Sequence, residues 1–234
     1  MIPYASRTNM ASAVKAWTEA GWRMLIEPSH YAFPQGRTAP PLAYMIDNGA
    51  WGCFKRGVEW DAAGFRRMVA EYGEGADMIV LPDIVEGGAE SLARSLEWVP
   101  ELAPVGTRLL LAVQDGMDAT EVLELCAERG LGIFVGGSTE WKLETIPTWG
   151  RVSRQIGCWL HVARVNSVKR IRFIAGHSAD SFDGTSTTLW PSTLRRLDLE
   201  VRQQTMFGAR GRTGLDDARY EAACDAALGG GRTE

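Results

Sequence analysis

The sequence predicts a single-domain α/β fold, a (β/α)8 TIM-like barrel, on three observations. Eight short apolar runs are spread along the chain, several are separated by amphipathic segments of helical length, and polar residues directly follow six of them. Continuous apolar strands that alternate with helices are typical of a parallel sheet covered by helices. The 234 residues also match the size of about 200–250 residues that such barrels reach as one domain.

The expected strands cover residues 1–5, 22–27, 42–47, 77–82, 108–114, 131–136, 158–163 and 180–184. Three of the segments between them have the apolar spacing of a helix, a capping residue in front and a glycine behind. These segments cover residues 8–21, 61–73 and 118–130, and the expected N-caps are Thr8 or Asn9, Asp61 and Asp118.

One unit of the expected barrel is irregular, because the stretch from Pro28 to Pro41 is rich in Pro, Gly, Ser and His and predicts a long loop. The alternative fold is an open, Rossmann-like sheet. It is weakened because no G-x-G-x-x-G fingerprint follows an early strand. We expect the barrel to span residues 1–228 and the tail, residues 229–234, to be disordered.

Composition limits the function classes. Hydrophobic residues make up 45% and charged residues 23% of the chain, as in ordinary globular proteins. The apolar runs are too short to cross a bilayer and no signal segment opens the chain, which predicts a cytoplasmic protein without membrane contact. The four cysteines are too widely spaced for a zinc pattern, which predicts buried, reduced thiols, no metal and no cofactor.

Polar residues gather at six expected strand ends, in "IDNGAWG", "LPDIVEGG", "VQDGM", "VGGST", "VARVNS" and "DSFDGTS". In this architecture the loops after the strands carry the active site. A single aspartate after a strand is most often a helix N-cap, and Gly136–Gly137 can be a plain turn. Six such endings at one rim favour a site instead. There Asp83 and Gln114 would meet the edge of a heterocycle, and the glycine pair would let a flat ligand approach the backbone.

These motifs, in this order, resemble the tRNA-guanine transglycosylase superfamily from Tyr4 to Ser186. "GGSTEWK" and "RVNS…DSFDGTS" are most similar to its DNA-acting branch, the 7-deazaguanine DNA transglycosylases of phages and bacterial modification islands. The resemblance implies a (β/α)8 pentosyltransferase that replaces guanine in DNA with a 7-deazaguanine, such as 7-cyano-7-deazaguanine, through a covalent Asp–deoxyribose intermediate. It implies DNA and the free base as partners, in the cytoplasm of the host cell if the chain is phage-encoded.

The resemblance also implies residue roles. The family's nucleophile, the second aspartate of D-x-F-D, matches Asp183, and its general acid/base matches Asp47 in "DNGA". Asp180 is expected to be structural and Phe182 to belong to the core. The residues implied to contact the base are Asp83, Gln114, Gly136, Gly137 and Val162.

The chain departs from the tRNA-acting enzymes at two points. It lacks their C-terminal zinc site of three cysteines and a histidine, and "GTSTTLW" stands where they have "CVLPTR" and a pair of arginines. DNA is therefore the favoured substrate. The alternatives that stay open are exchange in tRNA or a nucleoside, simple hydrolysis of the glycosidic bond, and a catalytically silent barrel that binds a purine or nucleic acid.

The net charge of −4 excludes a uniformly basic surface, but basic residues are concentrated in the C-terminal third. Such a cluster can track a polyanion or simply be a solvated helix face. The sequence leaves open the oligomeric state and whether a separate protein opens the duplex, since the target nucleotide must be extruded or single-stranded. The candidates for contact with nucleic acid are Arg164, Lys169, Arg170, Arg195 and Arg196.

Overall fold

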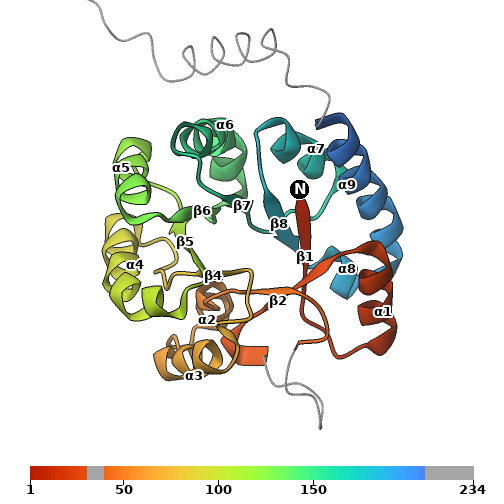
Figure 1. The fold of residues 1–234 in the computed structure, drawn as a ribbon, viewed down its shortest axis with the longest axis horizontal. Coiled ribbons are helices and arrows are strands. Elements are labelled where there is room, and N and C mark those ends of the chain that lie inside the picture. Colours follow the sequence, from red (N-terminus) through yellow and green to blue (C-terminus); the bar gives the residue numbers. More distant parts are fainter. Residues whose placement is uncertain (31–39, 209–234) are drawn as a thin grey trace, which may run out of the picture.

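Eight parallel strands form a closed barrel in which each strand pairs with the next and β8 pairs with β1 (Figure 1). The structure, a computed structural model, describes residues 1–30 and 40–208. The strands are β1 (Ile2–Ser6), β2 (Arg23–Ile26), β3 (Tyr44–Ile46), β4 (Met78–Val80), β5 (Arg108–Val113), β6 (Gly132–Val135), β7 (Leu160–Val162) and β8 (Ser181–Gly184). Every strand overlaps its predicted run, so the predicted (β/α)8 barrel is confirmed.

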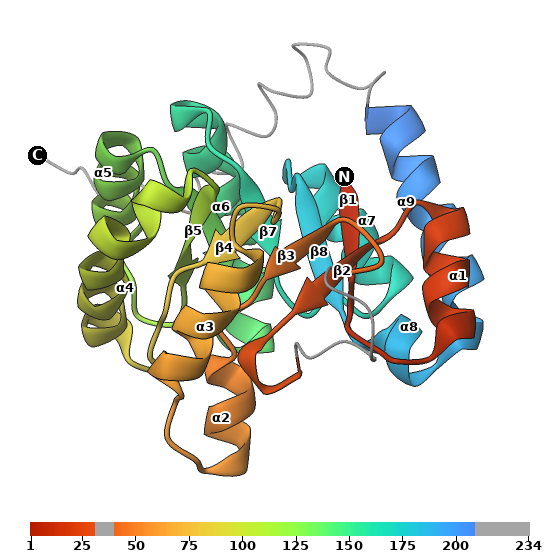
Figure 2. The same cartoon turned by 60° about the horizontal axis from the view of Figure 1, so that its bottom comes forward.

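Helices surround the barrel (Figures 1 and 2). They are α1 (Ala11–Ala20), α2 (Ala50–Arg56), α3 (Ala62–Tyr72), α4 (Gly88–Leu102), α5 (Ala119–Arg129), α6 (Thr139–Ile156), α7 (Val168–Gly176), α8 (Ser186–Leu189) and α9 (Leu194–Gly208). Short 3-10 turns are η1 (Pro28–His30), η2 (Ala103–Val105) and η3 (Pro191–Thr193). Within the described residues η1 alone stands between β2 and β3, as expected of the irregular unit. Residues 31–39 and the predicted tail, 229–234, lie outside them.

The predicted caps hold for two helices and fail for the third. Asp61 accepts a hydrogen bond from the Gly64 amide at 2.8 Å. Asp118 accepts from the amides of Thr120 and Glu121 at 2.8 and 3.0 Å. The N-cap of α1 is Met10 rather than Thr8 or Asn9. The Thr8 hydroxyl accepts from the Met10 amide at 3.2 Å, which forms a turn in front of the helix.

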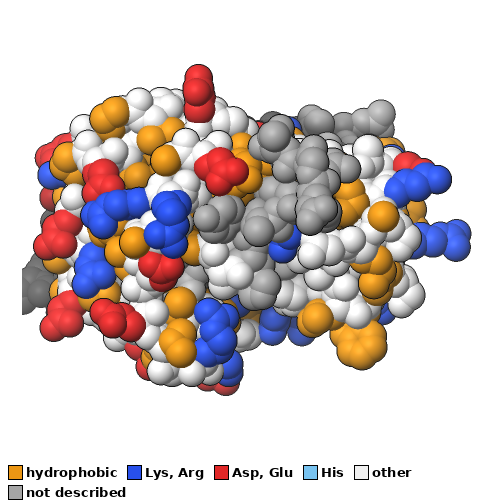
Figure 3. All heavy atoms as spheres, turned by 90° about the horizontal axis from the view of Figure 1, so that it is seen from below, with side chains coloured by type: hydrophobic (Ala, Val, Ile, Leu, Met, Phe, Trp, Pro, Cys, Tyr) orange, Lys and Arg blue, Asp and Glu red, His pale blue; other side chains and the backbone are white. Residues whose placement is uncertain are grey.

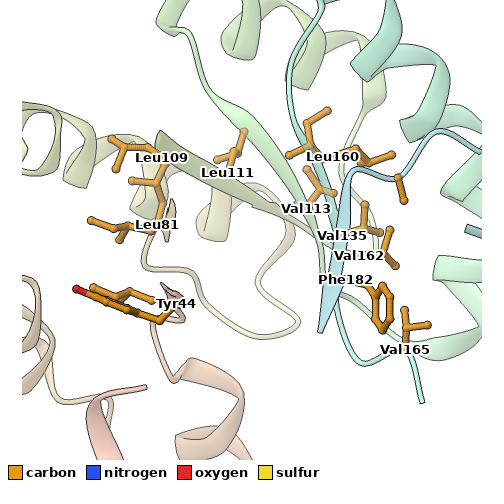
Figure 4. Close-up of a cluster of buried hydrophobic side chains, with 14 of the residues drawn as sticks. Tyr44, Leu81, Leu109, Leu111, Val113, Val135, Leu160, Val162, Val165 and Phe182 are labelled. Carbon is orange, nitrogen blue, oxygen red and sulfur yellow. The ribbon is translucent and has the colours of Figure 1, made fainter. Parts of the chain in front are cut away.

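Alternation along the strands divides the core into two layers, because successive side chains point to opposite faces of the sheet. One layer fills the barrel and includes Tyr4, Met45, Met78, Leu110 and Phe134. The other lies between strands and helices and includes the side chains of Figure 4, among them Leu111, Val113, Val135, Val162 and Phe182. Phe182 is fully buried there, which confirms its assignment to the core.

The two ends of the barrel differ. The N-terminus, where β1 begins, and helix α2 lie at opposite ends of the molecule (Figure 2). Because α2 follows β3, its end carries the carboxyl termini of the strands, where barrels of this kind place their active sites. In the described part of the chain, no helix combines the length and apolar character needed to cross a bilayer.

Candidate functional site

A cavity of about 790 Å³ opens among the loops at the carboxyl ends of the strands. Six of the seven residues singled out for chemistry or base binding line it: Asp47, Asp83, Gln114, Gly136, Gly137 and Asp183. They come from the ends of five different strands, β3 to β6 and β8. Contributions from several strand ends to one cavity are typical of catalytic sites in this architecture.

Asp183 is buried in the cavity wall, with 6% of its surface exposed. Its Oδ2 lies 3.0 Å from Nε2 of His161, and its Oδ1 accepts the backbone N–H of Arg164 at 3.1 Å. Asp180, three residues earlier, accepts the Leu160 amide at 2.8 Å and does not line the cavity. The two aspartates of "DSFD" therefore lie in different surroundings, and only Asp183 faces the cavity.

Asp47 follows β3 and keeps only part of its surface accessible, toward the cavity. Burial raises the pKa of its carboxyl group to about 8, although the Gly49 amide donates to Oδ1 at 2.7 Å and opposes the shift. The carboxylates of Glu27, Asp183 and Asp83 add to the rise. At neutral pH Asp47 is therefore mostly a neutral acid, able to donate a proton.

Asp83 follows β4 and is tied to the loop after β3. The side-chain amide of Asn48 donates to its Oδ1 at 2.9 Å and to the Leu81 carbonyl at 2.7 Å. Burial raises the pKa of Asp83 to about 6, while the Asn48 bond and the nearby Arg164 oppose the rise. Asp83 thus offers a fixed acceptor to the cavity.

Gln114 lines the cavity but uses its amide within the protein. Its Oε1 accepts the Glu86 amide at 2.6 Å. Its Nε2 donates to the Ile84 carbonyl at 2.7 Å and to the Ser91 hydroxyl at 2.6 Å. Both amide hydrogens are spent in these bonds, so in this conformation Gln114 shapes the loop beside Asp83 rather than presenting a donor to a ligand.

Gly136 and Gly137 both border the cavity, for different reasons. A Cβ at Gly137 would meet Asp115 Oδ2 and Trp141 at 2.6 Å, and its φ of +63° suits glycine, so the fold itself requires glycine there. A Cβ at Gly136 would lie 3.4 Å from the Val113 carbonyl, an ordinary contact. The fold does not require glycine at 136, and its missing side chain leaves the cavity wall open.

Val162 does not line the cavity. Its side chain points to the outer layer between β7 and the helices, beside Val135 and Phe182 (Figure 4). The reason is alternation: the neighbouring His161 faces the barrel, so Val162 must face away. The base contact assigned to Val162 is therefore corrected, because Ala163 and Phe134 are the apolar residues that border the cavity.

Arg164 joins three parts of the rim. Its guanidinium lies 4.2 Å from the centre of the Trp51 ring and donates to the Gly137 carbonyl, while its own backbone holds Asp183. It adopts a φ of +58°, which is uncommon for a residue other than glycine and costs of order 1 kcal/mol or more. Burial lowers the pKa of Arg164 below its ordinary value, but a guanidinium stays charged.

The other predicted contacts to nucleic acid stay outside the cavity. Lys169 and Arg170 lie at the start of α7, and Arg195 and Arg196 at the start of α9. Helices that follow barrel strands begin at the carboxyl end, so all four are on the side of the cavity mouth. Lys169, Arg195 and Arg196 are exposed, and Arg170 is half-buried. Along the lower edge of Figure 3, basic and hydrophobic side chains lie next to one another.

Sequence reasoning missed several residues of the cavity wall. Arg7 and Glu27 follow β1 and β2, Asn48 holds Asp83, and Asp115 fixes the glycine loop by accepting the amide and hydroxyl of Ser138 at 2.7 and 2.8 Å. Burial acts to raise the pKa of Asp115, but these bonds outweigh it and hold that pKa below its ordinary value. Asn48 and Asp115 stand within quoted strand-end motifs, and that position was the available signal.

Acidic side chains predominate in the described wall of the cavity. The acids are Glu27, Asp47, Asp83, Glu86, Asp115 and Asp183, and the bases are Arg7 and Arg164. Such a wall repels phosphate groups and attracts neutral or cationic ligands rich in hydrogen-bond donors. Within residues 1–30 and 40–208, no group of three or more His, Cys, Asp or Glu side chains is arranged to hold a metal ion.

No protein-family model and no curated protein matches the chain. Solved structures match at the level of the fold. A structure described as native KDPGal has a TM-score of 0.55 and 12% identity, over 89% of this chain and 95% of that one. The 3-hexulose-6-phosphate synthase of Salmonella typhimurium has a TM-score of 0.55 and 13% identity, over 87% and 100%. A putative fructose-1,6-biphosphate aldolase of Coccidioides immitis has a TM-score of 0.55 and 13% identity, over 88% and 86%. At such identities the similarity establishes the barrel fold.

Proposed function

We propose that this chain is a glycosyltransferase that replaces guanine in DNA with a 7-deazaguanine, similar to the 7-deazaguanine DNA transglycosylases. One observation carries the proposal. Asp183 and Asp47, the two carboxyl groups that the chemistry needs, face the same cavity but in different environments. Asp183 receives two N–H groups, whereas burial raises the pKa of Asp47 to about 8. Two acids with separated protonation behaviour are the usual sign of distinct acid/base and nucleophilic roles.

The proposed reaction has two displacements at C1′ of the deoxyribose. First a carboxylate oxygen of Asp183 bonds to C1′ while the bond from C1′ to N9 of guanine breaks, and neutral Asp47 protonates the departing base. Then the incoming 7-deazaguanine loses its N9 proton to ionised Asp47, and N9 displaces Asp183 from C1′. Splitting one hard step into two through a covalent sugar intermediate follows the logic of retaining glycosidases. The proton returns to Asp47, so the enzyme ends as it began.

The wall of the cavity supports a guanine-like ligand. Guanine presents N–H donors at N1 and N2, and the carboxylates of Asp83 and its neighbours are acceptors. Gly136 leaves room for a flat ring against the backbone, and the acidic wall disfavours a phosphorylated sugar as the occupant. The phosphates of the DNA would stay at the rim, where Arg164 and the starts of α7 and α9 supply positive charge.

The decisive experiment is incorporation of labelled guanine or 7-cyano-7-deazaguanine into DNA by the purified protein. Exchange into single-stranded or duplex DNA is expected, and Asp183→Asn should abolish it. Asp180→Asn is the matched control, because asparagine at 180 can still accept the Leu160 amide and position 180 does not reach the cavity. Mass spectrometry of protein quenched during turnover should find the deoxyribose strand attached to Asp183.

Other outcomes would separate the alternatives. Label in tRNA but not in DNA would contradict the substrate and keep the chemistry. Loss of guanine without incorporation would indicate hydrolysis. Binding of the base without either product would indicate a silent barrel, and full exchange by Asp183→Asn would overturn the nucleophile.

A further inference from the structure

A buried chain of hydrogen bonds runs from β7 and its preceding residue to Asp183. The Trp159 indole Nε1 lies 2.8 Å from Ser181 Oγ. Ser181 Oγ lies 2.8 Å from Nδ1 of His161, and Nε2 of His161 lies 3.0 Å from Asp183 Oδ2. His161 and Ser181 are fully buried. The register of β7 and β8 places His161 opposite Ser181, which makes the contact a direct result of the strand pairing.

The chemistry of the partners sets the direction of every proton in this chain. An indole N–H can only donate, so Ser181 Oγ accepts from Trp159. Among the described residues, the Ser181 hydroxyl proton then has Nδ1 of His161 as its acceptor. A neutral imidazole with Nδ1 accepting carries its hydrogen on Nε2. That hydrogen points at Asp183, so His161 donates to the carboxylate.

The imidazole has no room to turn. Its ring stacks on Phe134 with centroids 5.0 Å apart and an interplanar angle of 3°. The Tyr4 ring lies 5.9 Å away on a tilted plane. On the other oxygen of Asp183 the Arg164 amide is fixed in the positive-φ region. Two N–H groups on rigid supports therefore hold the carboxylate from two sides.

The trio of Ser181, His161 and Asp183 is the residue set of a hydrolase triad, but it runs in the opposite direction. In such triads the serine faces the substrate and the acid is buried. Here Ser181 is fully buried and absent from the cavity wall, while Asp183 faces the cavity. Ser181 cannot act as a nucleophile, and the end of the chain available for chemistry is the carboxylate.

We propose that His161 is a positioning residue for Asp183, with its tautomer set by Ser181 and Trp159. Its task is to hold Oδ2 so that the carboxylate keeps one orientation toward the cavity. What Asp183 does from that orientation rests on the proposed base exchange, whereas the tautomer and the hydrogen bond do not. The proposal can thus be tested with and without turnover.

The first test reads the tautomer by long-range ¹H–¹⁵N NMR of uniformly labelled protein. The His161 signals are assigned by their loss in His161→Gln, with His177 as an internal reference. We expect the pattern of the Nε2–H tautomer in the full chain and a mixed-tautomer pattern in Ser181→Ala. An Nδ1–H or imidazolium pattern in the unmutated protein at neutral pH would overturn the proposal, whatever the protein catalyses.

The second test separates positioning from folding by the kinetics of base exchange. His161→Phe keeps a ring on Phe134 but removes the donor, and kcat should fall on the order of 100-fold, as for a misplaced reacting group, with KM little changed. His161→Gln can place an amide N–H near the former Nε2 and should recover most of kcat. Ser181→Ala, the smaller change, should fall between them.

Equal kcat in His161→Phe and the unmutated protein would contradict the positioning role, and so would a loss that His161→Gln does not relieve although it folds. Thermal unfolding of each variant shows which ones are folded, and Ser181→Ala decides the matter if His161→Phe is not. If the unmutated protein exchanges no base at all, the proposed function fails, and the NMR pattern still decides the role of His161.

Discussion

Gly136 and Gly137 stand side by side in one loop, yet the structure needs glycine at only one of them. The sequence predicted the pair as a site where a ligand meets exposed backbone, and it could not separate this from a plain turn. The difference comes from Asp115 and Trp141, which crowd Gly137 from elsewhere in the chain and leave Gly136 free. Contacts of this kind depend on tertiary packing, so no local pattern reveals them.

Gly136→Ala should therefore separate ligand binding from stability. The new methyl group has only an ordinary contact with Val113, so the free energy of unfolding should change by about 1 kcal/mol or less. The same methyl group narrows the cavity wall, and the affinity for guanine or 7-cyano-7-deazaguanine should fall. Calorimetric titration and urea unfolding measure the two effects.

Gly137→Ala is the matched control and should lose stability first, because its methyl group would collide at 2.6 Å with two side chains. If Gly136→Ala binds the bases as tightly as the unmutated protein, the base does not lie against this wall.

The same limit explains Val162 and Gln114. The expected strand 158–163 was correct, but which of its side chains face the barrel depends on a register of one residue, and His161 takes the inward position. Gln114 was correctly expected at the cavity. Its amide is bound by Ile84, Glu86 and Ser91, which come from the loop after β4 and from α4. Position at a strand end was predictable from sequence, and the partners of each side chain were not.

At the scale of elements, the sequence motifs correspond to joints between neighbouring units. In "GGSTEWK", Ser138 caps α6 by accepting the Trp141 amide, and Lys142 donates from a buried position to the Ala163 carbonyl at 2.6 Å. In "VARVNS", Asn166 accepts the amides of Thr185 and Ser186 at 2.8 and 2.9 Å. The motifs that suggested a family therefore also hold adjacent loops of the mouth together, which is why sequence alone could not assign them to structure or chemistry.

Helix α2 carries the most prominent aromatic surface at the mouth. Trp51 and Phe54 stack with centroids 5.9 Å apart, and both are more than 40% exposed. Lys55 lies 5.8 Å from the Trp51 ring on the same helix. Aromatic faces beside cations are the usual means of binding unpaired bases without reading their sequence. The helix projects from the barrel end that holds the cavity (Figure 2).

Replacing both aromatic residues, Trp51→Ala with Phe54→Ala, should weaken binding of a fluorescent single-stranded oligonucleotide by about 1–3 kcal/mol per stacked base. The free energy of unfolding should change little because both side chains are exposed. Leu199→Ala, an equally exposed apolar residue on α9, is the control and should leave the anisotropy titration unchanged. Unchanged binding in the double variant would exclude α2 from the nucleic-acid contact.

At the scale of the whole molecule, the barrel gathers its acids at one end, and this has a cost in stability. The pKa of Asp47 is raised from 3.8 to about 8 and that of Asp83 from 3.8 to about 6, with burial as the main cause in each case. The folded protein therefore binds more protons than the unfolded chain from about pH 4 upward. By linkage, the free energy of unfolding must fall as the pH rises through this range.

The sign and the window give the last prediction. Each raised carboxyl group lowers the free energy of unfolding by at most about 1.4 kcal/mol per pH unit, both groups between pH 4 and 6 and Asp47 alone between pH 6 and 8. Asp47→Asn removes that titration while its side-chain oxygen can still accept the Gly49 amide. Urea unfolding at pH 5, 6.5 and 8 should show the variant gaining on the unmutated protein as the pH rises, whereas Asp61→Asn, at an exposed cap, should run parallel to it. Parallel curves for Asp47→Asn would mean that Asp47 is ionised at neutral pH, and it could not then protonate a departing base.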